Sequence, residues 1–426
     1  MTCAPRRRVL RALAGCAFGS LPLSRPARAA AARVVIVGAG WAGLAAAHAL
    51  RQAAPELDVT VLDRQRQWRS LPLSNPWLVG RTTERLPRVT LADLAARQGW
   101  RFVGGEATAI DRAQRRVLSD AGPLAYDWLL LATGARQDHR SWFGDDTRAA
   151  EQARLQWPGG FEVGELDRLQ QRLQAFAGGD LVMTIPPPPL RCPPAPYERA
   201  MLIGWWIKTR GLKARLTVLD AGAGMPRFNR VFAQRYAAQI DHRPYAVVQR
   251  VDPFARRISS SDGELRWDHA LLLPPMHAGP LLQQAGLLAR DAQGREGRWA
   301  AVDAATLRSP VDDRVWLAGD ALDSVSPLFG AYPKTAHVAA ELGAAAAGQI
   351  VAASRGEPAG PAPLPHSLCH VWLDADPAEQ LQLDTQYRRR GDGLIVQSVR
   401  QIDNPQPRDE DLAWARALLA QRLGIG

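Results

Sequence analysis

The chain has 426 residues, enough for two or three domains, with glycine, proline and aromatic contents that are ordinary for a globular protein. Its formal net charge is +11 at pH 7, but six of the positive charges are arginines in residues 1–29, a segment without acids, so the remainder carries only +5. This charge is too small and too scattered to indicate a nucleic-acid partner. We expect no membrane span, because no later segment approaches roughly 20 consecutive apolar residues.

Residues 1–29 resemble an export signal. The run RRRVLR at 6–11 is similar to the twin-arginine consensus, an apolar stretch follows, and Ala27-Arg28-Ala29 has small residues where a signal peptidase cuts. We therefore expect a soluble periplasmic protein that is exported already folded. One alternative is a lipid anchor on Cys16, which ends the box Leu13-Ala14-Gly15-Cys16, and another is a disordered basic tail.

Residues 33–63 predict the strand–turn–helix–strand unit of a dinucleotide-binding domain. Gly38 permits a tight turn, Gly40 lets the backbone approach a pyrophosphate, and Gly43 allows close packing of helix on strand. The N-terminus of the helix then faces the phosphates, and Asp63 at the end of the second strand is placed to accept the ribose hydroxyls.

Two later segments favour FAD over NAD as the dinucleotide. Residues 126–134 predict a strand that ends in the small-residue turn at Gly134, and residues 315–321 predict a late strand followed by Gly319 and Asp320. Both resemble segments of flavoproteins with two dinucleotide domains, where this aspartate holds the ribityl chain of FAD. Each segment alone would also fit an ordinary buried strand, so their order along the chain carries the prediction.

A predicted strand at 181–185 and a predicted helix at 197–208 enclose the place where a nucleotide-binding enzyme of this architecture would carry a second phosphate loop. The connection at 185–199 reads IPPPPLRCPPAPYER and contains no glycine, so its backbone cannot approach a pyrophosphate closely. We therefore expect no nicotinamide nucleotide there. The connection offers the thiol of Cys192 instead, in a loop that its prolines make rigid.

Removal of residues 1–29 leaves only two cysteines, Cys192 and Cys369. Two cysteines in an oxidising compartment tend to pair, and from composition alone such a bridge is either structural or redox-active. The eight histidines have no metal-ligand spacing, so we expect no metal site.

These patterns predict an α/β fold with two Rossmann-like domains and a small C-terminal α+β domain. The expected segments are a signal at 1–29, a discontinuous FAD-binding domain at 30–144 and 275–358, a second Rossmann-like domain with the cysteine loop at 145–274, and the C-terminal domain at 359–426. A predicted helix at 409–423 ends the chain, and we expect its apolar side to pack on its own domain.

Together, these segments resemble the flavoprotein subunit of flavocytochrome c sulfide dehydrogenase, a relative of sulfide:quinone reductase and glutathione reductase. The most specific part is RCPPAPYER at 191–199, close to the family's R-C-P-P-G-P-Y-E-R, and SLCHV at 367–371 matches the second cysteine site. The resemblance implies that Cys192 and Cys369 form a redox disulfide over the flavin and that Glu198 is the nearby acid/base. The other reading of Glu198 is a charge that merely suits the start of a helix.

Two residues depart from the family pattern. Leu71 stands in LPLSN where the family usually has the cysteine that attaches FAD, so we expect noncovalent FAD, and Ala195 replaces the glycine of the signature. Lys334 lies in a segment that resembles a family P-K-S segment beside the flavin. It either stabilises reduced flavin or is a solvated lysine at a helix start.

The resemblance implies a sulfide dehydrogenase that passes electrons from sulfide through the disulfide and FAD. The acceptor is expected to be a separate c-type cytochrome, since the chain has no C-x-x-C-H haem motif of its own. Three alternatives stay open: a sulfide:quinone reductase-like enzyme, an NAD(P)H-linked flavoprotein reductase, and a non-catalytic flavin-binding assembly subunit of a sulfur-oxidation system. The missing second glycine loop argues against the NAD(P)H-linked enzyme.

Overall fold

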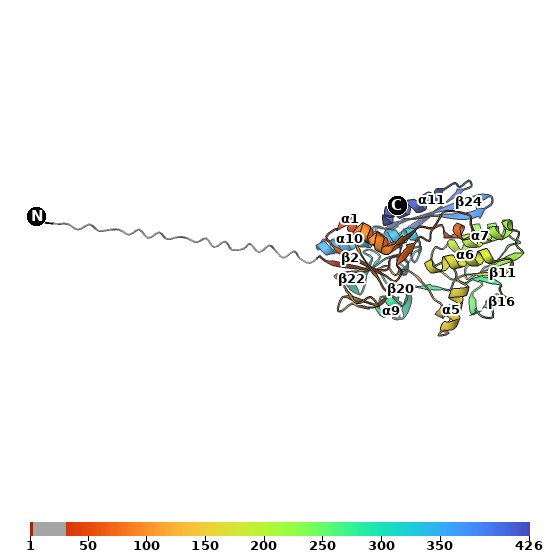
Figure 1. Cartoon of the computed structure of the whole chain (residues 1–426), viewed down its shortest axis with the longest axis horizontal. Helices are drawn as coiled ribbons and strands as arrows, with labels where there is room; N and C mark the ends of the chain where they lie inside the picture. Colours follow the sequence, from red (N-terminus) through yellow and green to blue (C-terminus); the bar gives the residue numbers. More distant parts are fainter. Residues whose placement is uncertain (3–30) are drawn as a thin grey trace. The chain divides into compact units, whose positions relative to one another are not determined.

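The structure is a computed structural model that describes residues 1–2 and 31–426 (Figure 1). The chain divides into two units, Met1–Ala31 and Ala32–Gly426. The export signal, Cys16 included, lies outside the described residues and stays a prediction. The helices and strands of the fold all belong to Ala32–Gly426.

The first sheet has six strands in the order β21-β22-β9-β1-β2-β5. Five of them run parallel, and only β21 is antiparallel to its neighbour. Their bounds are β1 (Arg33–Val37), β2 (Asp58–Asp63), β5 (Arg101–Gly104), β9 (Trp128–Leu131), β21 (Arg308–Ser309) and β22 (Asp312–Leu317). Residues 34–37 of β1 are fully buried, which accounts for the unbroken apolar run of this central parallel strand. The carboxyl ends of β1, β9 and β22 therefore meet at one edge, and each is followed by a predicted cofactor motif.

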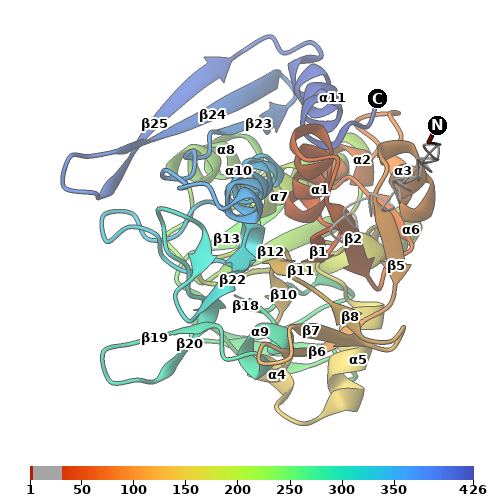
Figure 2. The same cartoon turned by 90° about the vertical axis from the view of Figure 1, so that its left-hand side faces the viewer.

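Two helices, α1 (Trp41–Ala53) and α10 (Ala336–Arg355), lie side by side over this sheet (Figure 2). The helices approach closely because a Cβ on Gly343 would collide with the Ala42 carbonyl oxygen. By length and composition α10 would suit a membrane span, so our expectation that no later segment approaches one was wrong. Most of its apolar window is buried inside the protein, and this burial explains the composition.

The second sheet has four parallel strands in the order β13-β12-β11-β17. Their bounds are β11 (Gly179–Ile185), β12 (Ala214–Asp220), β13 (Ile240–Arg243) and β17 (His269–Leu271). Helix α7 (Ala195–Thr209) connects β11 to β12, so β11–α7–β12 repeats the path of β1–α1–β2. The predicted strand at 181–185 and the predicted helix at 197–208 are confirmed.

The C-terminal part is a three-stranded antiparallel sheet with one helix. Strands β23 (Ser367–Ala375), β24 (Ala378–Arg389) and β25 (Ile395–Asn404) pair in sequence order, and α11 (Glu410–Leu423) follows. Leu418, Leu419 and Leu423 of α11 are buried. The helix contacts α1 and α10 as well as β23, so it does not pack on its own domain alone, as we expected from the sequence. β23 is an edge strand of its sheet and lies against α7.

The remaining elements are short. The helices are α2 (Ser74–Leu78), α3 (Leu91–Gln98), α4 (Arg140–Phe143), α5 (Thr147–Gln156), α6 (Leu166–Ala175), α8 (Pro226–Arg235) and α9 (Pro280–Gln284), with short 3-10 turns at Val163–Glu165 and Gly319–Ala321. The minor strands are β3 (Gln67–Arg69), β4 (Arg88–Thr90), β6 (Ala107–Asp111), β7 (Arg116–Ser119), β8 (Leu124–Ala125), β10 (Arg136–Gln137), β14 (Val248–Asp252), β15 (Arg257–Ser260), β16 (Gly263–Arg266), β18 (Met276–His277), β19 (Leu288–Arg290) and β20 (Glu296–Ala300). The predicted α/β class with a C-terminal α+β part is confirmed, while the exact domain boundaries stay predictions.

Candidate active site

Cys192 lies in the loop between β11 and α7, and its backbone is held in an unusual conformation. Its φ is +47°, in the left-handed region that residues other than glycine seldom adopt. The amide of Cys192 donates to the Lys334 carbonyl oxygen at 2.7 Å, and the amide of Ala195 donates to the Cys192 carbonyl oxygen at 2.8 Å. Such strained residues persist where the surroundings hold them, and they concentrate at functional sites.

Cys369 lies on β23. On either side of it, a backbone amide of this strand donates a hydrogen bond to a side chain from another element. The Leu368 amide donates to Nδ1 of His337 at 3.0 Å, and the Trp372 amide donates to Oε1 of Glu198 at 2.8 Å. These contacts satisfy donors that the edge strand would otherwise leave unpaired. They attach β23 to the starts of α10 and α7, and so fix the position of Cys369.

The structure brings the two predicted cysteines together. Both cysteine segments are hydrogen-bonded to the start of α10. The Lys334 carbonyl oxygen accepts from the Cys192 amide, and the His337 side chain accepts from the Leu368 amide. The thiols are near enough that Cys369 contributes to the raised pKa of Cys192. Both are free thiols in this structure, so the disulfide stays a prediction.

Burial raises the pKa of both thiols. The pKa of Cys192 lies well above its ordinary value, mainly because of burial, with Cys369 and Glu198 adding to the shift. The pKa of Cys369 rises to about 11 for the same first reason, and Glu198 again adds to it. Each thiolate is therefore a strong base here, and a reaction that releases one requires a proton donor nearby.

Glu198 is buried in the first turn of α7, between β23 and α2. Its carboxylate accepts hydrogen bonds from Nδ2 of Asn75 at 2.6 Å and from the Trp372 amide at 2.8 Å. Burial raises the pKa of Glu198 to about 7, although both hydrogen bonds favour the charged form. A charge placed only to suit a helix start would be solvated, so the geometry favours the acid/base reading. The role itself stays a prediction.

Asn75 and Arg199 complete the surroundings of Glu198, and sequence reasoning assigned neither a role. Asn75 also donates to the Ala195 carbonyl oxygen at 2.9 Å, and its Oδ1 accepts from Nε of Arg199 at 2.9 Å. Arg199 further donates to the carbonyl oxygens of Gly159 and Gly160 and lies over the Phe161 ring. Asn75 lies in the LPLSN segment and Arg199 in the RCPPAPYER segment, both of which match the family pattern. That match was the only sign in the sequence that these two residues belong to the site.

Arg191 ties the cysteine loop to the first sheet. Its guanidinium contacts Asp320 Oδ2 at 3.1 Å and donates to the carbonyl oxygens of Phe161 at 2.7 Å and Ala135 at 2.9 Å. Ala135 follows the predicted turn at Gly134, and Asp320 follows β22. Arg191 therefore places Cys192 beside the carboxyl edge where the cofactor motifs gather.

The predicted glycine turn has the form that a dinucleotide requires. Gly38 has a φ of +104°, and a Cβ on Gly43 would collide with the Gly38 carbonyl oxygen. A Cβ on Gly40 would meet nothing within 4 Å, so the N-terminus of α1 is open to a ligand. Asp63 ends β2, and its carboxylate accepts from the backbone amides of Ala39 at 2.6 Å and residue 65 at 2.7 Å.

The remaining predicted cofactor residues lie at the same edge. Gly134 follows β9, whereas Gly319 and Asp320 form the turn after β22. The Thr133 hydroxyl, just before Gly134, is buried without a hydrogen-bond partner among the described residues. The open helix end and this unpaired hydroxyl fit a bound FAD, the cofactor that the sequence resemblance implies.

Lys334 is buried, so the structure contradicts one of the two alternatives for it, the solvated lysine at a helix start. Its ammonium donates to the carbonyl oxygens of Asp320 at 2.7 Å and Leu322 at 2.9 Å, and it lies 3.7 Å from the centre of the Trp299 ring. Burial lowers the pKa of Lys334 to about 8. Lys334 therefore holds the Asp320 turn through its side chain and Cys192 through its backbone.

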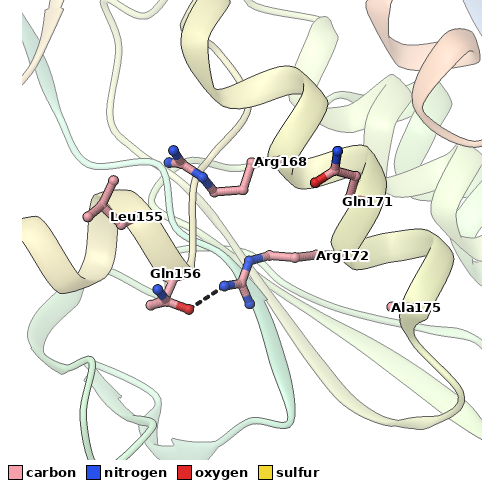
Figure 3. Close-up of a pocket in the computed structure, with 6 residues that line it drawn as sticks. All are labelled: Leu155, Gln156, Arg168, Gln171, Arg172 and Ala175. Carbon is pink, nitrogen blue, oxygen red and sulfur yellow. Dashed lines mark hydrogen bonds between the residues drawn. The ribbon is translucent and has the colours of Figure 1, made fainter.

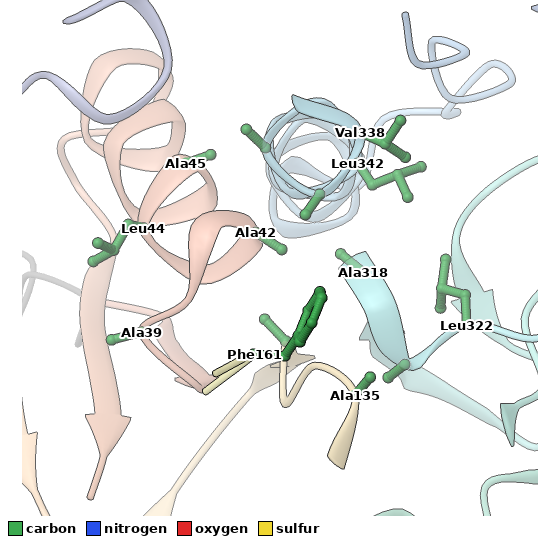
Figure 4. Packing of buried hydrophobic residues seen from close by; sticks show 14 of the residues in the cluster. Ala39, Ala42, Leu44, Ala45, Ala135, Phe161, Ala318, Leu322, Val338 and Leu342 are labelled. Atoms are coloured by element: carbon green, nitrogen blue, oxygen red, sulfur yellow. The ribbon is translucent and has the colours of Figure 1, made fainter. Parts of the chain in front are cut away.

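Hydrophobic packing closes this region around Phe161. Figure 4 shows its ring among Ala42 of α1, Ala135 and Ala318 at the end of β22. Phe161 comes from the segment just before α6, so the core of the first sheet continues toward the second. No three His, Cys, Asp or Glu side chains within residues 1–2 and 31–426 are grouped to hold a metal ion.

Comparison with known proteins agrees with this geometry. Residues 167–274 match the family model of the central part of the sulfide dehydrogenase [flavocytochrome c] flavoprotein chain, and residues 32–156 match that of pyridine nucleotide-disulphide oxidoreductase. The resemblance predicted from the sequence is confirmed. Neither model matches half of the chain, so the two matches show which flavoprotein oxidoreductase families these segments are similar to.

Individual relatives are more distant. The chain is 26% identical to sulfide-quinone reductase of Aquifex aeolicus and 30% identical to a ferredoxin–NAD(+) reductase component of Paraburkholderia xenovorans, each over 194 residues. Each match spans 44% of this chain and 42% of the relative, so less than half of either relative is matched. The solved sulfide:quinone oxidoreductase of Aquifex aeolicus superimposes with a TM-score of 0.74 over 92% of both chains, at 19% identity. This match shows the shared fold.

Proposed function

We propose that the chain is the flavoprotein of a sulfide dehydrogenase that uses Cys192 and Cys369 as a redox disulfide. The supporting observation is the meeting of Cys192, Cys369 and Glu198 beside the edge that carries the cofactor motifs. The three residues come from a loop, a strand and a helix, and each is attached by hydrogen bonds to another element. Such convergence of buried, chemically active groups is characteristic of an active site.

The proposed reaction begins with attack of hydrosulfide on the disulfide. Cys192 is the less buried of the two residues, so the proposal places the attack on the sulfur of Cys192. A new S–S bond to Cys192 forms a persulfide, while the Cys192–Cys369 bond breaks and leaves its electron pair on Cys369 as a thiolate. The raised pKa of Cys369 makes this thiolate a strong base. Glu198, with a pKa of about 7, is available near neutral pH to take a proton from hydrogen sulfide as hydrosulfide forms and to return a proton later in the cycle.

Gly38, Gly40, Gly43, Asp63, Gly134, Gly319 and Asp320 would hold the FAD. When bound, FAD supplies the two-electron acceptor that this disulfide chemistry needs. We further propose that FAD is noncovalent, since Leu71 has no nucleophile. Acid precipitation should release all of the yellow flavin into the supernatant, and flavin that stays with the protein pellet would contradict the proposal.

A c-type cytochrome is the proposed electron acceptor, and a quinone is the second candidate, favoured by the sulfide:quinone oxidoreductase fold. Steady-state turnover with cytochrome c and with a soluble quinone analogue separates the two acceptors.

One measurement tests the sulfur chemistry directly. Anaerobic titration of the purified protein with sulfide should bleach the flavin absorbance at about one equivalent, with a long-wavelength thiolate–flavin band. A protein that keeps its oxidised spectrum would instead fit the non-catalytic assembly subunit. Bleaching by NADH and not by sulfide would favour an NAD(P)H-linked reductase.

The proposed location is the periplasm, and it rests on the twin-arginine pattern of residues 1–29. Fractionation of cells that express the full chain, with and without Arg6→Lys and Arg7→Lys, tests export. Recovery of both proteins in the same fraction would refute the twin-arginine route. Metabolic labelling with a fatty acid tests the alternative anchor at Cys16.

A further inference from the structure

Asn75 links three features of the site that are far apart in the sequence. Its side chain is 4% exposed, and its amide makes hydrogen bonds to Glu198, to the Ala195 carbonyl oxygen and to Arg199. Ala195 and Glu198 begin α7, whereas Asn75 comes from α2. Asn75 thus forms the contact between the 71–75 segment and the end of the cysteine loop.

The chemistry of the neighbours fixes which way the amide points. A guanidinium can only donate, so Oδ1 of Asn75 must face Arg199 and Nδ2 must face Glu198. The amide therefore mediates between a cation and a carboxylate that are adjacent in sequence. Arg199 and Glu198 form no direct ion pair in the described structure, because the other Arg199 donors go to Gly159 and Gly160.

We propose that Asn75 is a positioning residue that orients the Glu198 carboxylate and sets its affinity for a proton. The use of that proton in sulfide oxidation rests on the proposed function, but the positioning does not. Loss of the Asn75 donor removes a hydrogen bond that favours the charged carboxylate. The other charged or titratable groups facing Glu198 are Arg199, Asp411 and the two thiols.

The test measures the Glu198 carboxyl itself. In pH-difference infrared spectra of the flavin-loaded protein, the protonated-carboxyl band that disappears in Glu198→Gln belongs to Glu198. Asn75→Leu should move the midpoint of that band upward by about one to two pH units, since a hydrogen bond to a charged group contributes about 1.5–3 kcal/mol. Asn229→Leu on α8 is the matched control and should leave the midpoint unchanged.

A second variant covers the case in which Asn75→Leu does not fold. Asn75→Asp keeps the shape and the acceptor for Arg199 but places a second carboxyl beside Glu198, so the pair should share one proton and the midpoint should also rise. An unchanged midpoint in the variants that fold would refute the positioning role. A shifted midpoint together with unaffected sulfide oxidation in Glu198→Gln would uphold the positioning and reject the proposed use of Glu198.

A different observation supports an anion site on the second domain. A hollow of about 400 Å³ lies between α5 and α6, lined by Leu155, Gln156, Arg168, Gln171, Arg172 and Ala175. Figure 3 shows Arg172 bonded to Gln156, with Arg168 one turn earlier on the same helix. Nε of Arg172 is buried without a partner, and Arg168 forms no ion pair within residues 1–2 and 31–426.

We infer that this hollow binds a small tetrahedral oxyanion. Two like charges four residues apart on a helix repel each other, and the charge of Arg168 contributes to the lowered pKa of Arg172 after burial. No carboxylate lines the hollow to offset them. Guanidinium groups match sulfate-like and phosphate-like anions through paired hydrogen bonds.

Calorimetric titration of the full chain with thiosulfate, sulfate and phosphate, at constant ionic strength in chloride, tests this site. We expect saturable 1:1 binding of at least one anion and at least a tenfold loss of affinity in Arg168→Gln, which breaks no side-chain hydrogen bond or ion pair among the described residues. Arg154→Gln, at an exposed position of α5 outside the hollow, should bind normally. No saturable binding, or equal losses in both variants, would overturn the inference.

Discussion

The two Rossmann-like units follow the same strand–turn–helix–strand path but differ at the turn. In the first unit, glycines leave the N-terminus of α1 open, and the carboxylate of Asp63 accepts only backbone amides. In the second unit, prolines and Cys192 fill the turn. Asp220, the counterpart of Asp63, is 1% exposed, and its Oδ2 accepts from the Tyr197 hydroxyl at 2.8 Å and lies 3.0 Å from Nε2 of His242.

This difference shows how one scaffold serves two kinds of chemistry. The first unit keeps its polar groups for a ligand, whereas the second satisfies Asp220 internally with side chains from α7 and β13. A ribose would have to displace both Tyr197 and His242 to reach Asp220. The second unit is therefore built to hold a thiol, in agreement with the proposal that no nicotinamide nucleotide binds there.

The largest expected effect comes from removing the thiol of the second turn. Cys192→Ser should lower the rate of flavin reduction by sulfide by on the order of 10⁴-fold or more, as loss of an enzyme's nucleophile does. FAD content should stay normal, because the first turn is untouched. Stopped-flow measurement of flavin bleaching checks the rate. A variant that still reduces its flavin at the wild-type rate would remove the disulfide from the mechanism.

Glu198→Gln should have the next largest effect, because it keeps the shape of the side chain and removes only the ionisable group. We expect flavin reduction by sulfide to slow by about 10²–10⁴-fold, with partial recovery at higher pH as more hydrosulfide anion forms. Cys192→Ser provides the lower limit of the rate. Unchanged kinetics would mean that Glu198 only supports the fold.

The same variant has a stability signature with a definite sign. The pKa of Glu198 is raised from 4.5 to about 7 in the folded state, so the folded protein binds the proton more tightly than the unfolded chain. The resulting stabilisation of the folded state is fully present below about pH 4.5 and is lost as the pH rises through 7. Between these limits the wild type should lose roughly 3 kcal/mol relative to Glu198→Gln. Urea unfolding of both proteins at pH 4.5 and pH 8 measures the difference, and parallel curves would contradict the raised pKa.

Gly43→Ala tests whether the first turn binds FAD. The added methyl group would collide with the Gly38 carbonyl oxygen and force α1 away from β1, which should cost about 1–3 kcal/mol of stability and weaken FAD binding. Gly348→Ala, in α10 with nothing within 4 Å of the new methyl group, is the matched control. Equal FAD retention in both variants would argue against a cofactor role for this turn.

The sequence predicted what is local in these two turns. The glycines at 38–43 and the thiol within a proline-rich connection follow from short-range rules about φ and close approach, and the structure has both. The sequence did not predict the hydrogen bond between Asn75 and Glu198. The two residues are 123 positions apart, and nothing in the motif around either one indicates the other as its partner. For the same reason, the sequence could not decide whether Lys334 is buried, since its partners lie in the turn after β22 and on β20 rather than in its own segment.

Ala195→Gly should have the smallest effect, although it restores the family's signature residue in the second turn. The contacts of Ala195 that hold the site use backbone atoms: its amide donates to the Cys192 carbonyl oxygen, and its carbonyl oxygen accepts from Asn75. Both survive the loss of a methyl group. Glycine adds flexibility at the start of α7, so we expect at most about 1 kcal/mol of destabilisation and a rate of flavin reduction within a few-fold of wild type. A tenfold change in that rate would show that the methyl group itself orients the strained Cys192, and the signature position would then tune the thiol.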